Sequence, residues 1–272
     1  MGNIVITGCS TGIGLTTANY LRDQHIDVYP TARDPKDVEM LRALGFNHAM
    51  QLDVTKYEEI ASVIEYVLQQ DGKIDAWFNN AGFGQPGVVE DITTETLRAQ
   101  FETNLFGLHE CTRQIIPVMR KQGGYGKIIQ HSSVLGLVSL FGRGAYNASK
   151  YAIEGLTDTL RLELAETNIY PVLLNTGPIY SDFRNNALEK LRENVDIEHS
   201  LFRQQYHEKL EGAEKKVPFS EESISVAKVV HRIILAEKPK PRYYITKATC
   251  LLGALKRLLS TGFLDKLLIK IG

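Results

Sequence analysis

The stretch that decides the fold is Thr7-Gly8-Cys9-Ser10-Thr11-Gly12-Ile13-Gly14, near the start of the sequence. It follows the short apolar run of residues 3–6 and leads into residues 12–23, whose apolar side chains have helical spacing. A glycine turn between a strand and a helix presents backbone N–H groups and the positive end of the helix to a phosphate. The sequence therefore predicts a phosphate-binding loop whose candidate contacts are Gly8, Ser10, Thr11, Gly12, Ile13 and Gly14.

Strand-like and helix-like runs alternate along the rest of the chain. The expected strands are residues 3–7, 27–32, 48–52, 75–79, 127–131, 170–175 and 242–246, and the expected helices are residues 12–23, 36–44, 56–70, 94–121, 146–166, 221–236 and 249–269. This alternation predicts right-handed crossovers and an α/β fold, a doubly wound parallel sheet of Rossmann type. Ligands of such a sheet lie at the carboxyl ends of its strands.

One domain is expected over residues 1–246, with a lid and a tail. Residues 181–218 break the alternation with a polar, charged stretch rich in helix formers, which predicts a helical lid inserted into the domain. Residues 247–272 are expected to form a basic amphipathic C-terminal helix, since eight basic residues and one acidic residue follow position 237. The tail is too charged to span a bilayer. It either packs on the body or on a second subunit, which is the favoured reading, or lies on a membrane surface.

Composition narrows the class of protein. The chain has 272 residues, of which 43% are hydrophobic and 23% charged, as in a globular domain with a sizeable core. A net charge of −1 creates no field that attracts nucleic acid. Three cysteines form neither a closed set of disulfides nor a zinc pattern, and the first strand begins without a secretory signal. We therefore expect a cytoplasmic protein, peripheral to a membrane if the tail binds one, with no metal and no nucleic-acid partner.

Two other glycine patterns in the sequence offer alternatives to the phosphate-loop interpretation. Gly8–Gly12 also matches G-x-S-x-G, the turn that carries the nucleophile of α/β-hydrolases, which would make Ser10 a catalytic serine. That enzyme class takes part of its oxyanion hole from an earlier loop, and only seven residues precede Gly8, so this alternative is disfavoured. Gly82–Gly87 reads G-x-G-x-x-G, but Pro86 and the residues after it start no helix promptly, which indicates a loop beside a ligand.

The end of the second strand indicates which dinucleotide binds. A carboxylate there holds the ribose 2′-hydroxyl of NAD, whereas an arginine accommodates the 2′-phosphate of NADP. Ala32 has no carboxylate, and Arg33 offers a planar set of donors, so NADP(H) is the expected cofactor. Asp34 is assigned to capping the next helix, with Pro35 at the first helical position.

Further candidate cofactor contacts follow the third and fourth strands. Asp53 can accept from the adenine amino group or cap the next helix, and Val54 lies beside it. The small residues after the fourth strand would let the backbone approach the ribose, which makes Asn80, Ala81 and Gly82 candidates.

A tyrosine and a lysine carry the candidate chemistry. Tyr146 and Lys150 are four residues apart at an expected helix start and share one face. An ammonium near a phenol lowers its pKa and makes it a candidate proton donor to an alkoxide. Ser132 and Ser133 follow the strand 127–131, where a hydroxyl can orient a substrate oxygen, although either serine could equally be a satisfied loop hydroxyl.

Taken together, Thr7-Gly8-x-x-x-Gly12-Ile13-Gly14, Asn79-Asn80-Ala81-Gly82, Ser133 and Tyr146-x-x-x-Lys150 resemble the classical short-chain dehydrogenase/reductase family over at least residues 3–183. The resemblance implies that Ser133 polarises the substrate, that Tyr146 is the acid/base, and that Lys150 holds the nicotinamide ribose and lowers the pKa of Tyr146. It implies that Asn104 holds a proton-relay water, although a kink-stabilising amide in a long helix is compatible with that role. It also implies dinucleotide contacts at Gly177, Pro178, Ile179 and Ser181.

One departure from the family pattern is Thr176, which stands where a proline usually does and should alter the stiffness of the nicotinamide loop. Within the family the chain is most similar to retinol- and hydroxysteroid-dehydrogenase-like members and to bacterial NADP-dependent aldehyde reductases. Leu137, Val138, Leu140 and Phe141 would then face an apolar substrate or pack in the core.

The expected function is therefore NADP(H)-dependent hydride transfer between nicotinamide and a carbonyl or alcohol carbon of a small apolar substrate of aldehyde, ketone, retinoid or steroid type. The expected direction is reduction, by a homodimer or homotetramer. The alternative outside redox chemistry, besides the hydrolase, is a catalytically idle dinucleotide-binding regulator.

Overall fold

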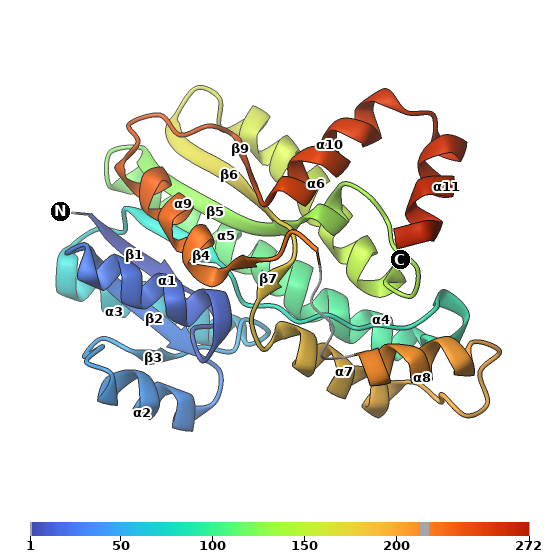
Figure 1. The fold of residues 1–272 in the computed structure, drawn as a ribbon. Coiled ribbons are helices and arrows are strands. Elements are labelled where there is room, and N and C mark those ends of the chain that lie inside the picture. The colour runs from blue at the N-terminus through green and yellow to red at the C-terminus, as the bar shows by residue number, and fades with distance from the viewer. Residues whose placement is uncertain (1, 213–217, 272) are drawn as a thin grey trace.

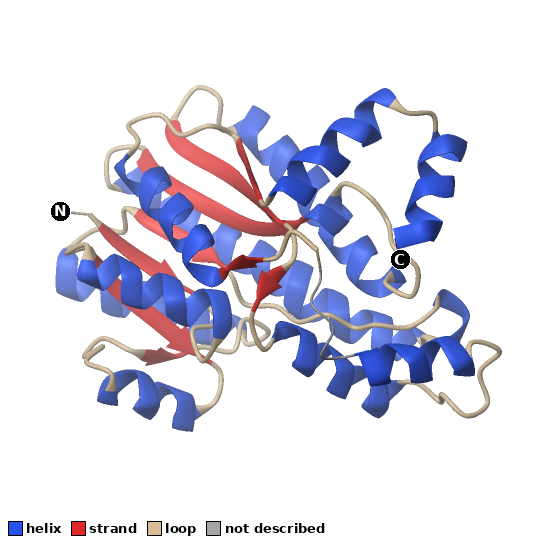
Figure 2. Ribbon diagram, in the orientation of Figure 1, coloured by secondary structure: helices blue, strands red, loops and turns tan. Residues whose placement is uncertain are grey.

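A seven-stranded parallel sheet organises the chain, of which the computed structural model describes residues 2–212 and 218–271. The strand order is β3-β2-β1-β4-β5-β6-β9, which confirms the doubly wound arrangement (Figures 1 and 2). The bounds are β1 Asn3–Ile6, β2 Asp27–Ala32, β3 Met50–Gln51, β4 Ala76–Asn79, β5 Tyr125–Ser133, β6 Asn168–Thr176 and β9 Arg242–Ile245. The order reverses between β1 and β4, and such a reversal opens a crevice at the carboxyl ends of the strands.

Helices cover both faces of the sheet. They are α1 Gly12–Asp23, α2 Pro35–Ala43, α3 Tyr57–Asp71, α4 Thr94–Phe101, α5 Leu108–Lys121, α6 Gly144–Glu163, α7 Phe183–Asn194, α8 Arg203–Glu211, α9 Ser223–Leu235, α10 Lys247–Leu258 and α11 Thr261–Ile271. Successive strand residues point to opposite faces. Ile4 and Ile6 thus join the core under α1 and α9, whereas Val5 joins the core under α3 and α5.

The expected long helix 94–121 is interrupted. Residues Glu102–Gly107 form a π-helical segment between α4 and α5. Gly107, the last residue of this segment, packs closely on Val54, because a Cβ there would lie 2.6 Å from the Val54 side chain. The segment turns Asn104 inward, where the side chain is almost fully buried.

The stretch expected to form a lid contains two helices with their own small core, and its role as a lid stays a prediction. Helices α7 and α8 pack around Leu188, Leu191, Val195 and Tyr206 against Val88. The short strands β7 Ile179–Tyr180 and β8 Glu221–Glu222 pair and join the two ends of the insertion. Residues 213–217 of the expected lid lie outside the described residues.

The tail forms two helices rather than the single helix expected over 247–272, a range whose last residue lies outside the described residues. The chain leaves the helix at Leu259, and the carbonyl of Ser260 accepts from Phe263 and Leu264 to begin α11. Ser-Thr-Gly is a sequence of helix-end residues, which explains the break. Leu264 and Leu268 of α11 are buried against Val134, Leu135 and Val138, so one face of the tail packs on the body of the same chain.

The outer face of the tail is apolar and basic. Leu258, Phe263 and Ile269 are 80%, 63% and 77% exposed, and Lys256, Arg257, Lys266 and Lys270 are exposed near them. Within residues 2–212 and 218–271, no helix has the length and hydropathy needed to cross a membrane.

Candidate active site

The predicted phosphate loop forms a tight cradle between β1 and α1. Gly8 and Gly12 have φ values of 71° and 58°, which glycine adopts without the penalty paid by other residues. A Cβ on Gly14 would lie 2.2 Å from the Gly8 carbonyl oxygen, so the turn closes only with glycine there. The loop leads directly into the N-terminus of α1, whose first N–H groups have no partner within the helix.

The loop after β4 is fastened to this cradle. The Thr7 hydroxyl accepts from the Asn80 and Ala81 N–H groups at 3.0 and 2.9 Å. The Asn80 amide donates to the Thr7 and Gly8 carbonyls, both at 2.9 Å. Two predicted contact segments thus lie side by side at the switch between β1 and β4. Thr7 is part of the glycine motif, but the sequence did not predict that its hydroxyl fastens the loop after β4.

The loop after β6 closes the other side. A Cβ on Gly12 would lie 3.4 Å from the Ser181 side chain, and Ile13 and Ile179 pack against the same core cluster. Gly177 is required because a Cβ there would lie 2.1 Å from the Thr246 hydroxyl. The Pro178 carbonyl accepts from Glu221 at the base of the lid. The predicted nicotinamide loop therefore lies next to the predicted phosphate loop.

The ends of β2 and β3 hold the remaining predicted cofactor contacts. Arg33 is exposed directly after β2. Asp34 accepts from Lys36 N at 2.9 Å with Pro35 at the start of α2, the capping role assigned to it. Asp53 accepts from both the backbone and the hydroxyl of Thr55, which favours its local turn role. Val54 is buried in the core under α3 and α5.

Ser133 and Tyr146 meet at the end of β5. The Ser133 hydroxyl is close enough to the Tyr146 phenol to lower its pKa, and it accepts from Leu135 N at 3.1 Å and donates to Thr176 O at 3.4 Å. The neighbouring Ser132 points the other way and donates to Glu154. The structure thus separates two serines that the sequence left equivalent, and only Ser133 faces the tyrosine.

Desolvation determines the protonation state of Tyr146. It raises the pKa of the phenol to about 12, although the Ser133 hydrogen bond and the Arg143 charge both lower it. The net shift is opposite to the lowering by Lys150 that the family resemblance implies. A phenol with this pKa is protonated near neutral pH, which is the form that donates a proton.

Lys150 lies one turn along α6 from the tyrosine. Its Nζ atom is 5.5 Å from the centre of the Tyr146 ring and donates to the His131 carbonyl at 2.6 Å. Burial lowers the pKa of this lysine to about 8, while the Glu154 carboxylate opposes the shift. Lys150 therefore stands between the tyrosine and the end of β5.

Asn104 clamps the loop that follows β4. Its amide oxygen accepts from Phe83 N and its amide nitrogen donates to Phe83 O, both at 3.0 Å. The Gly82–Gly87 stretch starts no helix, as expected, and a Cβ on Gly84 would lie 3.7 Å from the Tyr146 ring. The amide thus holds a loop that borders the tyrosine, and the relay role stays a prediction.

Two buried polar residues near the tyrosine were missed. His131 Nδ1 lies 3.0 Å from the Asn80 amide oxygen, and Nε2 lies 3.2 Å from the Thr176 hydroxyl. Desolvation and the Lys150 charge lower the pKa of this histidine to about 3, so the ring is neutral. Glu154 accepts from Ser132, Asn175 and Arg242 under the end of β5. Only the i, i+4 spacing of Lys150 and Glu154 could have pointed to it.

The hydrolase alternative lacks its geometry. In the described part of the chain, the Ser10 hydroxyl has no hydrogen bond to a histidine. Both ring nitrogens of His131, the histidine in β5, are within hydrogen-bond distance of other residues, Asn80 and Thr176. No group of three metal-ligating side chains occurs among the residues that the structure describes.

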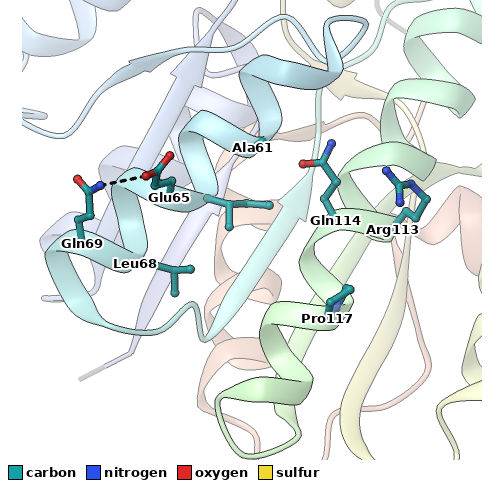
Figure 3. A pocket seen from close by; sticks show the side chains of 8 residues that line it. Ala61, Glu65, Leu68, Gln69, Arg113, Gln114 and Pro117 are labelled. Atoms are coloured by element: carbon teal, nitrogen blue, oxygen red, sulfur yellow. Dashed lines mark hydrogen bonds between the residues drawn. The ribbon is translucent and has the colours of Figure 1, made fainter.

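A surface groove lies away from this site. It has a volume of about 630 Å³ and is lined by residues of α3, among them Glu65 and Gln69, and by Arg113, Gln114 and Pro117 of α5 (Figure 3). None of the predicted site residues lines it. The predicted catalytic residues therefore lie at the end of β5 and in α6 rather than at this groove.

Comparisons with known proteins agree with this geometry. The family model described as short chain dehydrogenase matches residues 2–192. The uncharacterised oxidoreductase YbbO of Escherichia coli K12 is 37% identical, covering 98% of this chain and 93% of its own. Retinol dehydrogenase 8 of Bos taurus is 34% identical over 69% of this chain and 62% of its own. Human 17-beta-hydroxysteroid dehydrogenase type 1 is 32% identical over 90% of this chain and 77% of its own.

Solved structures share the fold. A serine dehydrogenase complexed with NADP+ superimposes with a TM-score of 0.77 at 21% identity, covering 91% of this chain and 95% of that one. A short-chain dehydrogenase/reductase from Burkholderia phymatum in complex with NAD superimposes with a TM-score of 0.75 at 23% identity, covering all of this chain and 96% of that one.

Proposed function

Because this chain belongs to the short-chain dehydrogenase/reductase family and is an oxidoreductase of its retinol- and hydroxysteroid-like branch, we propose that it reduces apolar carbonyl compounds with NADPH. The observation that carries this proposal is the grouping of Ser133, a protonated Tyr146 and Lys150, whose Nζ atom lies 5.5 Å from the centre of the Tyr146 ring.

The residues present fit a nicotinamide dinucleotide. The cradle at Gly8, Gly12 and Gly14 leaves room that a Cβ would fill, and the positive end of α1 suits a pyrophosphate. Asn80, Ala81 and Gly82 would border the ribose, and Gly177 to Ser181 would hold the carboxamide. A reduced nicotinamide bound there supplies the hydride.

The residues of the chain then manage the proton. Ser133 orients the carbonyl oxygen of the substrate, and the phenol of Tyr146 donates its proton to that oxygen as the carbon accepts hydride. The products are an alcohol and a phenolate that regains its proton from solvent. Lys150 is the nearest cation on the same helix face and stabilises that phenolate.

NADP(H) is proposed over NAD(H) because Arg33, rather than a carboxylate, follows β2. Asp34 is occupied by its own helix cap, which leaves the arginine to meet a 2′-phosphate. The substrate is proposed to be apolar because Phe183 covers Tyr146, with ring centres 5.6 Å apart. The names of the retinol and hydroxysteroid relatives support the same class, as aldehydes, ketones, retinoids or steroids.

Turnover tests the proposal. NADPH consumption is measured against a panel of aldehydes, ketones, retinoids and steroids with the wild type, Tyr146→Phe and Ser133→Ala. We expect Tyr146→Phe to lower kcat by at least about a hundredfold while NADPH binding, measured by fluorescence, is retained. Absence of turnover with every carbonyl, or equal turnover in Tyr146→Phe, would favour the catalytically idle regulator instead.

We also propose that the exposed face of α10 and α11 contacts an anionic membrane surface. Its apolar side chains stand among four cations, and its inner face is already packed on the body. The homodimer or homotetramer expected from the sequence stays a prediction.

A further inference from the structure

Three cations from three elements lie close to one another, and one of them, Arg143, is also close to the tyrosine. Arg143 is the residue before α6, Arg184 lies in α7, and Lys209 lies in α8. Arg143 is close enough to Tyr146 for its charge to lower the pKa of the phenol. A Cβ on Gly142 would lie 3.5 Å from the Lys209 Nζ atom, which places this lysine over the loop that leads into α6.

The charges of these groups oppose one another. Burial, together with the charges of Arg143 and Arg184, lowers the pKa of Lys209 to about 7. Burial and Arg184 also lower the pKa of Arg143. Like charges that are partly removed from water destabilise a fold unless an anion offsets them.

The described residues supply no such anion to two of the three. Neither Arg143 nor Lys209 forms an ion pair or side-chain hydrogen bond with any residue of 2–212 or 218–271, whereas Arg184 donates to the Gly212 carbonyl. Elsewhere in the same ranges, the partly buried Arg242 pairs with Glu154 and Asp158.

Aromatic side chains adjoin two of these cations in the sequence. Phe183 directly precedes Arg184, and its ring centre lies 5.6 Å from that of Tyr146, while Phe141, two residues before Arg143, lies 5.5 Å from the Phe202 ring. The segments beside the tyrosine thus carry both apolar rings and cations. This combination suits an apolar chain that ends in a carboxylate.

We propose that Arg143 and Lys209 bind the carboxylate of an otherwise apolar oxo acid whose carbonyl reacts at Tyr146. This inference rests on the proposed function and narrows its substrate class. Charge-assisted hydrogen bonds to carboxylates are among the strongest polar contacts in proteins, so the site discriminates between an acid and its neutral ester.

The test compares ω-oxo carboxylic acids of increasing length with their methyl esters, using NADPH as reductant. The wild type should prefer the best acid over its ester in kcat/KM by about tenfold or more, the value of one charge-assisted contact. Lys209→Gln should remove most of that preference, and Lys209→Arg should retain it. Lys190→Gln is the matched control, since this lid lysine is exposed and pairs with Glu193.

A binding measurement separates this inference from the proposed function. Calorimetric titration of a saturated fatty acid, with the fatty alcohol of the same length as reference, requires no turnover. Weaker acid binding by Lys209→Gln than by the wild type supports the site even if no carbonyl is reduced. Equal binding of acid and alcohol by the wild type, or equal acid binding by both proteins, overturns it.

Discussion

The Nε2 atom of His131 lies 3.2 Å from the Oγ1 atom of Thr176, and this contact joins β5 to the last residue of β6. The same ring reaches Asn80 through Nδ1, so one neutral histidine connects the loop after β4 to the end of β6. Thr176 stands where the family usually has proline. The hydroxyl thus supplies by hydrogen bonding a restraint that a proline ring would supply covalently.

Thr176→Val should therefore loosen the nicotinamide loop. The substitution keeps the shape but leaves His131 Nε2 without its partner, a loss of about 1–3 kcal/mol in the free energy of unfolding. Urea unfolding measures that loss, and the KM for NADPH should rise with it. Thr176→Ser keeps the hydroxyl and serves as the control; a Val variant as stable as the Ser variant would contradict the role of the contact.

Gly14→Ala should abolish dinucleotide binding. Its Cβ would meet the Gly8 carbonyl oxygen at 2.2 Å, so the loop must open and the fold is destabilised. Gly155→Ala is the matched control, because nothing lies within 4 Å of its Cβ on exposed α6. That change should raise the free energy of unfolding by about 0.5–1 kcal/mol. The free energies of unfolding of both variants are measured by thermal or urea unfolding. Repeating the measurement with NADPH shows whether each variant still binds the dinucleotide.

The pH profile of reduction should follow Lys150 rather than Tyr146. A pKa of about 12 keeps the phenol protonated across the working range, whereas the lysine loses its charge as pH rises through about 8. We expect kcat to be constant at lower pH and to fall above about 8. Lys150→Arg keeps the cation, since a guanidinium stays protonated, and should remove the fall. A wild-type profile that stays level to pH 10 would exclude Lys150 as the titrating group.

Arg33 should decide between the two dinucleotides. Arg33→Ala is expected to raise the KM for NADPH about tenfold, the value of one charge-assisted phosphate contact, and to leave that for NADH unchanged. Arg33→Lys keeps the charge and should show an intermediate value. Steady-state kinetics with both cofactors decide, and an unchanged KM for NADPH in the Ala variant means that another group reads the phosphate.

The tail should bind anionic vesicles in a salt-dependent manner. Phe263 and Ile269 are exposed on α11, so replacing both with Glu removes apolar contact and adds repulsion without disturbing the core. Flotation with vesicles of phosphatidylserine and phosphatidylcholine measures the effect. Leu162→Glu, at an exposed position on α6, is the control. No flotation of the wild type at low salt would rule out the membrane contact.

Elements with local signals were predicted well from the sequence. Helix α1 and strand β2 have the expected bounds. The cap at Asp34 was predictable because its partner, Lys36 N, is only two residues away. Strand β3 is shorter than expected because it pairs with β2 alone at the sheet edge. The π-helical segment was missed, since no local pattern shows that Gly107 packs on Val54 from another part of the chain.

In the candidate site, too, residues joined by local spacing were predicted and residues joined by long-range contacts were not. Tyr146 and Lys150 were predictable because one helical turn joins them. The contact of His131 with Thr176 joins residues 45 apart, and that of Arg242 with Glu154 joins residues 88 apart, so no sequence spacing reveals them. Val138 was a candidate substrate contact, but it is buried against the tail helices, whose position is set only by tertiary packing.

The pairing of β9 with β6 also bears on how the chain folds. The whole stretch 177–241 lies between these partners, and α11 then packs on the loop after β5. Closing so long a loop lowers the conformational entropy of the chain before the contacts that stabilise the pairing have formed. Such non-local pairing therefore slows folding. The half of the sheet formed by β5, β6 and β9, against which the helix of Tyr146 packs, should thus be the last to acquire protection from hydrogen exchange, after the half built by β1, β2 and β4.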